Sequence, residues 1–132
     1  KRALPGSKPY RYRSADGIEI LVGKNAAQNE RLTLAAAPDE MWLHAREMPG
    51  SHVIIRATGE IPLTTLKQAA LLAAWYSKGR DSSNVPVDYT QAKYVKKPNG
   101  AKPGMVIFTN NGTVWVDPKD PENKGQNMEK SH

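Results

Sequence analysis

The chain has 132 residues, of which 39% are hydrophobic, and its 19 Lys and Arg against 13 Asp and Glu give a formal charge of +6. This length fits one domain, and the absence of cysteine excludes disulfide scaffolds, cysteine-based zinc sites and thiol nucleophiles. No apolar run approaches the roughly 20 residues that cross a bilayer, and no signal-like segment is present, so membrane insertion is not expected.

The first elements predicted along the chain are an arm and a β-hairpin. Residues 1–9 mix Pro, Gly and basic residues, which is typical of a linker, and the absence of an initial Met indicates a piece of a longer protein. From Tyr10 to Arg13 aromatic and basic residues alternate, as they do in a strand. Asp16-Gly17 is a turn signal, and apolar residues then return at every second position up to Val22, so we expect two antiparallel strands.

The first predicted helix covers residues 25–36. Asn25 is followed three residues later by Gln28, which resembles a capping box, in which the Asn side chain accepts from a free amide and the Gln returns the bond. Ala, Glu, Arg and Leu then favour a helix. Pro38 prevents its continuation.

Two strands are predicted before the second helix. Residues 41–46 alternate in a way that places Trp42, His44 and Arg46 on one face and the apolar residues between them on the other. A Pro-Gly-Ser turn at 49–51 separates this segment from a β-branched run at 52–56. We expect these two strands to be antiparallel.

The second predicted helix covers about residues 64–78. Thr65 and Gln68 fit the capping-box pattern in front of an Ala-rich run. Small residues with helical spacing would allow this helix to approach a sheet closely. Gly79 suits a left-handed C-terminal cap.

The remaining segments predict further short strands and a disordered tail. Residues 87–95 favour a strand, and an Asn-Gly hairpin is predicted to join strands at 105–109 and 113–116. Residues 118–132 are polar and lack apolar periodicity, so we expect disorder there after a domain that spans residues 10–117. The whole pattern predicts an α+β fold, with an antiparallel or mixed sheet of five to seven short strands and two main helices.

The positive charge is concentrated in two segments. Residues 1–13 contain five basic residues and no acid, and residues 93–102 contain four basic residues and no acid. Clustered cations are typical of polyanion binders, because each neutralised phosphate releases counterions. Solubilising charge on a terminus and a loop is the alternative interpretation.

Three local patterns are candidate RNA contacts. The Trp42, His44 and Arg46 face combines groups that stack on bases and hold phosphate, although a tryptophan in a strand more often packs in the core. The turn at Gly50 and Ser51 could offer amides and a hydroxyl to an anion, or simply bond its own backbone. Prolines stiffen the loop at 96–104, so its lysines would lose little entropy when they bind phosphate. The alternative is an ordinary solvated loop.

The histidines His44 and His52 form a fourth candidate. Such a pair could act as general acid and base in RNA cleavage or contribute two metal ligands. The sequence offers no clear third residue that would complete either site, and no catalytic or phosphate-loop motif is present. Structural histidines are therefore the favoured interpretation, and no cofactor or metal is expected.

These pieces together resemble the NFACT-R domain, the C-terminal RNA-binding module of NFACT proteins, over roughly residues 10–117. Each piece alone is weak, but their common order is specific to the family. The matching segments are Asp16-Gly17, Ile20-x-Val22-Gly23-Lys24-Asn25, Gln28-Asn29, Asp39-x-x-Trp42-x-His44, Pro49-Gly50-Ser51-His52-Val53, Ala69-Ala70-x-x-Ala73-Ala74-x-Tyr76-Ser77, Val85-Pro86-Val87-Asp88-Tyr89 and Val95-Lys96-Lys97-Pro98-x-Gly100-Ala101-Lys102-Pro103-Gly104.

The resemblance implies a role in ribosome-associated quality control. Family members bind large ribosomal subunits that carry a stalled nascent-chain tRNA, recruit aminoacyl-tRNA and promote untemplated C-terminal tailing, with alanine in bacteria. The family is also described as fibronectin-binding adhesins on the surface of Gram-positive bacteria. A full-length member has a coiled coil and other domains before this module, so residues 1–9 would be the arm that leaves the coiled coil.

We therefore expect a non-catalytic RNA-binding module that acts in the cytoplasm, with tRNA, the large ribosomal subunit and the other domains of the same protein as partners. Fibronectin and a cell-surface location are the alternative. A ribonuclease that uses His44 and His52 is a third hypothesis. The residues expected to contact RNA are Arg11, Arg13, Lys24, Trp42, His44, Arg46, Gly50, Ser51, His52, Lys96, Lys97 and Lys102.

Overall fold

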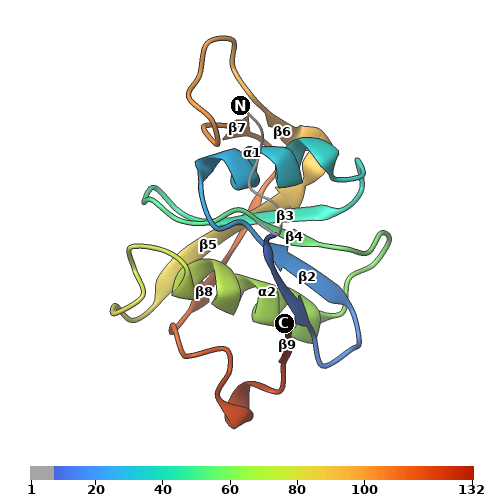
Figure 1. Ribbon diagram of the computed structural model, residues 1–132, viewed down its shortest axis with the longest axis vertical. Helices are drawn as coiled ribbons and strands as arrows, with labels where there is room; N and C mark the ends of the chain where they lie inside the picture. The colour runs from blue at the N-terminus through green and yellow to red at the C-terminus, as the bar shows by residue number, and fades with distance from the viewer. Residues whose placement is uncertain (1–7) are drawn as a thin grey trace.

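The fold is known from a computed structural model that describes residues 8–132, so most of the arm expected at 1–9 lies outside the described residues. Its main element is a seven-stranded antiparallel sheet, in agreement with the α+β fold expected (Figure 1). Its strands are β1 (Tyr10–Arg13), β2 (Glu19–Val22), β3 (Met41–Ala45), β4 (Val53–Ile55), β5 (Val85–Gln91), β8 (Gly112–Val116) and β9 (Glu129–Ser131). Their order in the sheet is β8-β5-β3-β4-β2-β1-β9.

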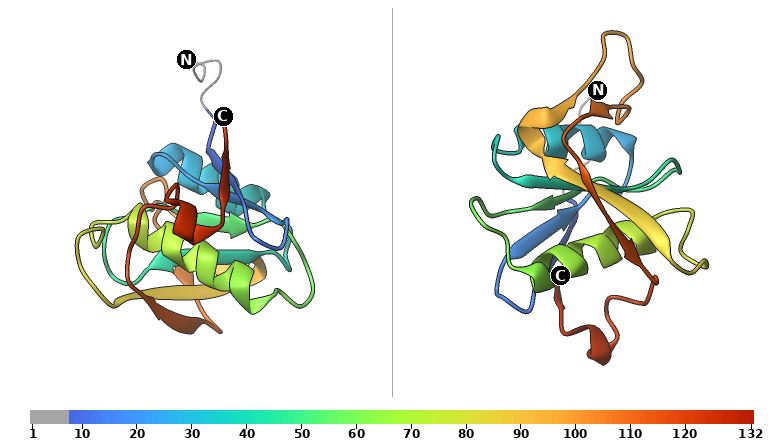
Figure 2. Two further views of the ribbon diagram at one scale, coloured as in Figure 1. Left: turned by 90° about the horizontal axis from the view of Figure 1, so that it is seen from below. Right: turned by 180° about the vertical axis from the view of Figure 1, so that it is seen from behind.

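Two helices cover the two faces of this sheet. Figures 1 and 2 show α2 (Leu63–Trp75) running across one face, while α1 (Ala26–Ala35) lies on the other. The α1 cap is the expected one, since the Asn25 side chain accepts a bond from the Gln28 amide at 2.9 Å. The return bond differs slightly, because the Gln28 side chain accepts from the Lys24 amide instead of the Asn25 amide.

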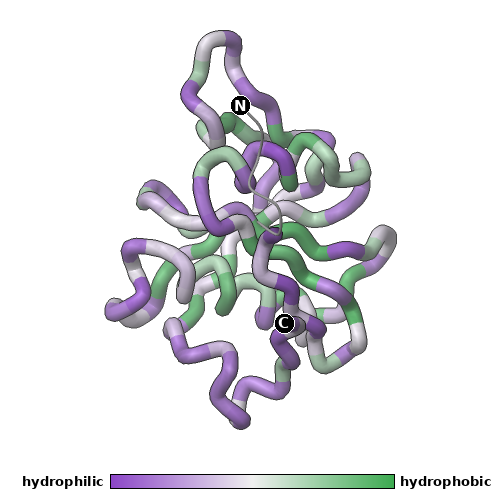
Figure 3. The backbone as a smooth tube through the Cα atoms, viewed as in Figure 1, coloured by the Kyte–Doolittle hydropathy of each residue, from purple (hydrophilic) through white to green (hydrophobic). Residues whose placement is uncertain are grey.

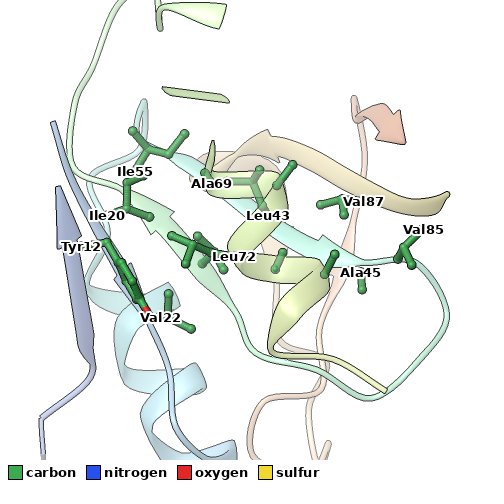
Figure 4. Packing of buried hydrophobic residues seen from close by; sticks show 14 residues of the cluster. Tyr12, Ile20, Val22, Leu43, Ala45, Ile55, Ala69, Leu72, Val85 and Val87 are labelled. Carbon is green, nitrogen blue, oxygen red and sulfur yellow. The ribbon is translucent and has the colours of Figure 1, made fainter. Parts of the chain in front are cut away.

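The main core lies between α2 and the sheet. Figure 4 shows Leu43 and Ala45 of β3 packed with Leu72 and Ala69 of α2. Buried alanines let the helix approach the strands closely, as the sequence predicted. Each large aliphatic side chain buried there contributes about 1.5–3 kcal/mol.

The start and end of α2 differ from the prediction. The helix begins at Leu63 and has no side-chain cap, because the Thr65 hydroxyl is buried and donates to Asp16 at 2.7 Å. It ends at Trp75 with Tyr76 as its C-cap, and Gly79 is not in the left-handed region. Tertiary hydrogen bonds therefore replace the predicted capping box.

The predicted Asn-Gly hairpin does not form. The strand β7 (Ile107–Phe108) pairs with β6 (Val95–Lys96) in a separate two-stranded sheet that follows the short helix η1 (Ala92–Tyr94). β8 pairs instead with β5 at the edge of the large sheet. The two-stranded sheet lies beside α1, and the loop between its strands projects from the molecule (Figure 1).

The tail expected to be disordered is folded. It contains the short helix η2 (Lys124–Gln126) and the strand β9, which pairs antiparallel with β1. Pro121 is fully buried, and Lys130 lies 4.6 Å from the centre of the Tyr10 ring. The segment is largely hydrophilic (Figure 3), so its order comes from backbone pairing and a few contacts instead of apolar periodicity.

Candidate nucleic-acid interface

A groove of about 1300 Å³ opens on the face of the sheet that carries α1. Most of its lining comes from four places: the start of α1, strand β3 with the turn that follows it, the segment after α2, and residues 103–108, while β1 and β5 add Tyr10 and Asp88. These segments lie far apart in the sequence, so the groove is a product of the fold.

His52 lies at the base of this groove and joins three elements. The Trp42 indole N–H donates to His52 Nδ1 at 3.1 Å, and the Thr33 hydroxyl lies 2.6 Å from the same nitrogen. Because an indole N–H can only donate, Nδ1 is an acceptor and the ring proton is on Nε2. Nε2 then donates to the Gly104 carbonyl at 3.0 Å.

This environment keeps His52 neutral. Burial lowers its pKa to about 4, and charge repulsion from His44 acts in the same direction. Burial also lowers the pKa of His44, whose Nδ1 lies 2.6 Å from the Ala45 carbonyl. With both ring nitrogens of His52 engaged and only 2% of the residue exposed, this pair does not fit the acid–base role of a ribonuclease.

Trp42 lies in the interior and does not form an open stacking platform. The residue is 1% exposed, and Phe108 packs on it with ring centres 4.8 Å apart. The core interpretation of Trp42 is therefore the one that the structure favours. Arg46, which follows Trp42 in the same segment, donates to the Asp88 carboxylate at 2.9 Å, and its side chain is half-buried.

The basic loop after β6 is fixed at its far end. The Gly104 amide donates to the Glu30 carboxylate at 3.1 Å, and the Lys97 ammonium lies 3.1 Å from the same oxygen. The hydrogen bond from Lys97 holds the pKa of Glu30 below its usual range. Gly104 has φ +82° and packs against Ala26, where a side chain would be strained.

Three cations at the groove have no acidic partner. Among residues 8–132, none of the ion pairs involves Lys24, Lys78 or Arg80. Two of them lie beside an aromatic ring instead: Lys24 is 4.8 Å from the centre of the Tyr10 ring, and the Arg80 guanidinium is 5.7 Å from that of Tyr76. The two tyrosines stack on each other with centres 4.8 Å apart.

Sequence reasoning missed Lys78 and Arg80, which belong to the segment after α2. Each is a single basic residue in a polar stretch, so neither stands out as a cluster. The only local signal was the aromatic pair Trp75-Tyr76 just before them. The sheet brings Tyr10 to this segment from near the N-terminus.

The structure divides the predicted site residues into two groups. Those on β1, on β6 and on the loop after β6 do not line the groove: Arg11 pairs with Glu19, and Arg13 donates to the Gly17 carbonyl. Lys96 is exposed at the end of β6, and Lys102 is exposed on the loop. The predicted residues that line the groove are Lys24, Trp42, His44, Arg46, Gly50, Ser51 and His52, and those that do not are Arg11, Arg13, Lys96, Lys97 and Lys102.

Metal ligation and membrane insertion have no visible basis in the described part of the chain. Within residues 8–132 there is no group of three or more His, Asp or Glu side chains placed to hold a metal ion. In the same range, no helix has both the length and the apolar character to cross a membrane.

Comparisons with known proteins agree on one family. Residues 8–110 match the family described as NFACT protein RNA binding domain. The chain is 55% identical over 108 residues to the Rqc2 homolog RqcH of Bacillus subtilis, which is 81% of this chain and 19% of that protein. It is 42% identical over 123 residues to the Rqc2 homolog RqcH of Streptococcus suis, which is 92% of this chain and 22% of that protein. The chain thus spans about a fifth of the length of these curated relatives, at 19% and 22%.

A solved structure has the same fold. The C-terminal part of the fibronectin/fibrinogen-binding protein from Streptococcus suis superimposes with a TM-score of 0.87 and 41% sequence identity. The match covers 95% of this chain and 51% of that one.

Proposed function

The chain belongs to the NFACT family of RNA-binding domains, and from this premise we propose that its groove, together with the loop after β6, binds RNA. The observation that carries the proposal is the placement of Lys24, Lys78 and Arg80 in one groove without acidic partners. Unpaired cations attract phosphate, and they give up no internal ion pair when it binds.

The whole protein would be a factor of ribosome-associated quality control. Two relatives of high identity are named Rqc2 homolog RqcH, and they are about five times as long as the matched segment, which is 19% and 22% of their lengths. We propose that the partners are tRNA and the large ribosomal subunit, that the site of action is the cytoplasm, and that the other domains of the same chain complete the surface. Support of C-terminal alanine tailing belongs to this proposal.

The test is RNA binding by the 132-residue chain, measured by fluorescence anisotropy with labelled tRNA over a range of salt concentrations. We expect affinity to fall steeply with salt and to fall again in Lys24→Gln. The matched control is Lys67→Gln, an exposed lysine of α2 that does not line the groove. Affinity that is independent of salt, or equal in the two variants, would contradict the proposal.

The partner in cells is tested on the full-length protein. Crosslinking followed by sequencing of the recovered RNA should give tRNA together with rRNA of the large subunit. Recovery of neither RNA above a strain that lacks the protein would contradict the quality-control role.

The module itself would have no catalytic activity. The motivating observation is the neutral and buried state of His52, which removes one partner of the proposed acid–base pair. Labelled tRNA incubated with the chain should stay intact on a denaturing gel. Cleavage that is lost in His44→Gln would favour the ribonuclease hypothesis.

Fibronectin binding is the second candidate, because the solved structure with the same fold carries the name of a fibronectin/fibrinogen-binding protein. The chain offers open sheet edges at β8 and β9 that could accept an added strand. A pull-down of fibronectin should be repeated with Lys96→Glu/Lys102→Glu. Binding that survives this charge reversal would support an adhesin, and binding that disappears would indicate simple attraction to a polycation.

A further inference from the structure

We propose that the groove takes unpaired nucleotides and not a duplex, with phosphates on Lys24, Lys78 and Arg80 and bases against Met105 and Ile107. This inference rests on the proposed RNA-binding function. It assigns phosphate contacts to the three groove cations and adds Met105 and Ile107 as contacts to the bases.

The cationic part of the groove is arranged in advance. The Arg80 Nε donates to the Trp75 carbonyl at 2.6 Å, and its guanidinium lies 4.4 Å from the centre of the Trp75 ring. Lys24 is placed by the Tyr10 ring, which is itself stacked on Tyr76. Because these contacts restrict the long side chains before RNA arrives, less side-chain entropy is lost when a phosphate binds.

The apolar part of the groove is unusually open. Met105 is 61% exposed and Ile107 is 60% exposed, and both line the groove. Large apolar side chains that gather in one concave site mark a place for an apolar partner surface. The faces of nucleobases are such a surface, and because every base has one, this contact is tolerant of sequence.

The apolar part is also held rigidly. Ile107 belongs to β7, which pairs with β6, and Met105 follows Gly104, whose amide and carbonyl are both hydrogen-bonded to the body of the domain. Phe108 anchors the next position through its contact with the buried Trp42 ring. Thus Trp42 positions the apolar wall, and it does not contact the base itself.

A single groove that offers both kinds of surface discriminates between forms of RNA. A duplex presents phosphates and 2′-hydroxyls on its outside while its base faces are stacked internally, so Met105 and Ile107 would stay exposed to water. An unpaired strand or loop can place phosphates on the cations and turn base faces toward the apolar residues. The pairing of these surfaces therefore favours unpaired RNA.

The experiment compares one labelled RNA of about twelve nucleotides as a single strand, and annealed to its complement, by fluorescence anisotropy with the 132-residue chain. We expect the single strand to bind at least about tenfold more tightly, because a base that covers one large exposed apolar side chain contributes an effect of about this size. Met105→Ser/Ile107→Ser should lose about tenfold in affinity for the single strand and leave duplex binding unchanged. The control Leu34→Ser/Leu63→Ser changes two equally exposed apolar residues, 64% and 62%, outside the groove.

A second pair of variants tests the cations. Lys78→Gln/Arg80→Gln should weaken single-strand binding and reduce the slope of log affinity against log salt by about 1.4, since each single-strand phosphate contact contributes about 0.7. Lys67→Gln/Lys119→Gln, which removes the same charge elsewhere, should not change this slope as much. Thermal unfolding of every variant shows whether it remains folded.

The outcomes separate the inference from the function on which it rests. Equal or tighter binding of the duplex, or no effect of Met105→Ser/Ile107→Ser in a folded variant, overturns the inference and leaves RNA binding standing. Failure of every RNA to bind removes the proposed function as well.

Discussion

At the scale of single residues, His52 decides how the groove is built. Its ring accepts from Trp42 on β3 and donates to Gly104, while its backbone amide donates to the Asn29 side chain of α1 at 3.0 Å. One neutral imidazole thus holds the sheet, the first helix and the end of the basic loop together. A second proton on Nδ1 would face the indole N–H, which cannot accept it.

The protonation state of His52 predicts a pH dependence of stability. The unfolded chain protonates His52 at its ordinary pKa of 6.5, whereas the folded protein does so only at about 4. Between these values the unfolded state holds the extra proton, so the free energy of unfolding should fall as the pH drops from about 6.5 to about 4. The loss for this residue is about 3 kcal/mol, measured by urea unfolding at several pH values.

The control for this prediction is His52→Gln, which removes the titrating group. Its stability should be lower at pH 7 but should depend less on pH between 6.5 and 4. A weaker dependence remains, because burial also lowers the pKa of His44. If the two proteins lose stability in parallel across this range, His52 is not the group that causes the loss.

At the scale of elements, the start of α2 shows where local pattern and tertiary structure compete. Thr65 and Gln68 have the right spacing for a capping box, yet both turn outward from the helix to other parts of the chain. Thr65 bonds Asp16, and Gln68 accepts from the Ala15 amide at 2.8 Å. The motif identified the helix correctly but not the function of its residues.

Thr65→Val tests this tertiary role. The substitution keeps the shape of the buried side chain but removes the hydroxyl that Ser14 and Asp16 contact. We expect a loss of about 1–3 kcal/mol in the free energy of unfolding, with unchanged helix content in far-ultraviolet circular dichroism. The matched control is Thr64→Val, one residue earlier and exposed. Equal losses in both variants would contradict the tertiary role, and reduced helix content in Thr65→Val alone would instead indicate a capping role.

The last strand gives a second prediction at this scale. Deletion of residues 118–132 would expose the β1 edge that β9 covers and remove the buried Pro121. We expect a lower midpoint of thermal unfolding and faster hydrogen exchange in β1, since unpaired edge groups exchange readily. Removal of His132 alone, which leaves β9 complete, is the control. An unchanged midpoint after the long deletion would mean that β9 adds nothing to the fold.

These elements also show how far the sequence could be used. Three parts of the fold follow from patterns within a few residues, and all were predicted: the hairpin β1–β2, the helix α1 and the antiparallel pair β3–β4. β9 and the pairing of β7 with β6 were not, because a strand of Glu, Lys and Ser has no apolar period and a pairing partner leaves no local signal. The groove has the same limit: the turn at Gly50 and Ser51 was recognised, but Lys78 and Arg80 reach it only through the fold.

At the scale of the whole molecule, the charge of +6 falls into two functional classes. Some cations are tied to acids within the fold, such as Arg11, Arg46 and Lys97. Others have no acidic partner among the described residues, and some of these lie in the groove or on the projecting β6–β7 hairpin, as Lys96 and Lys102 do. Under the proposed function, the groove cations hold RNA in place and the hairpin cations attract it from a distance.

The groove cations and the exposed cations Lys96 and Lys102 should affect different rate constants of RNA binding. Exposed loop charges act mainly during encounter, so Lys96→Gln/Lys102→Gln should lower the association rate constant for RNA several-fold at low salt and leave the dissociation rate constant nearly unchanged. Groove cations contact the bound strand, so Lys78→Gln/Arg80→Gln should mainly raise the dissociation rate constant. Stopped-flow fluorescence at two salt concentrations measures both rate constants. If the loop variant dissociates faster and the groove variant does not, the loop and not the groove holds the RNA, and the assignment of the two basic surfaces must be exchanged.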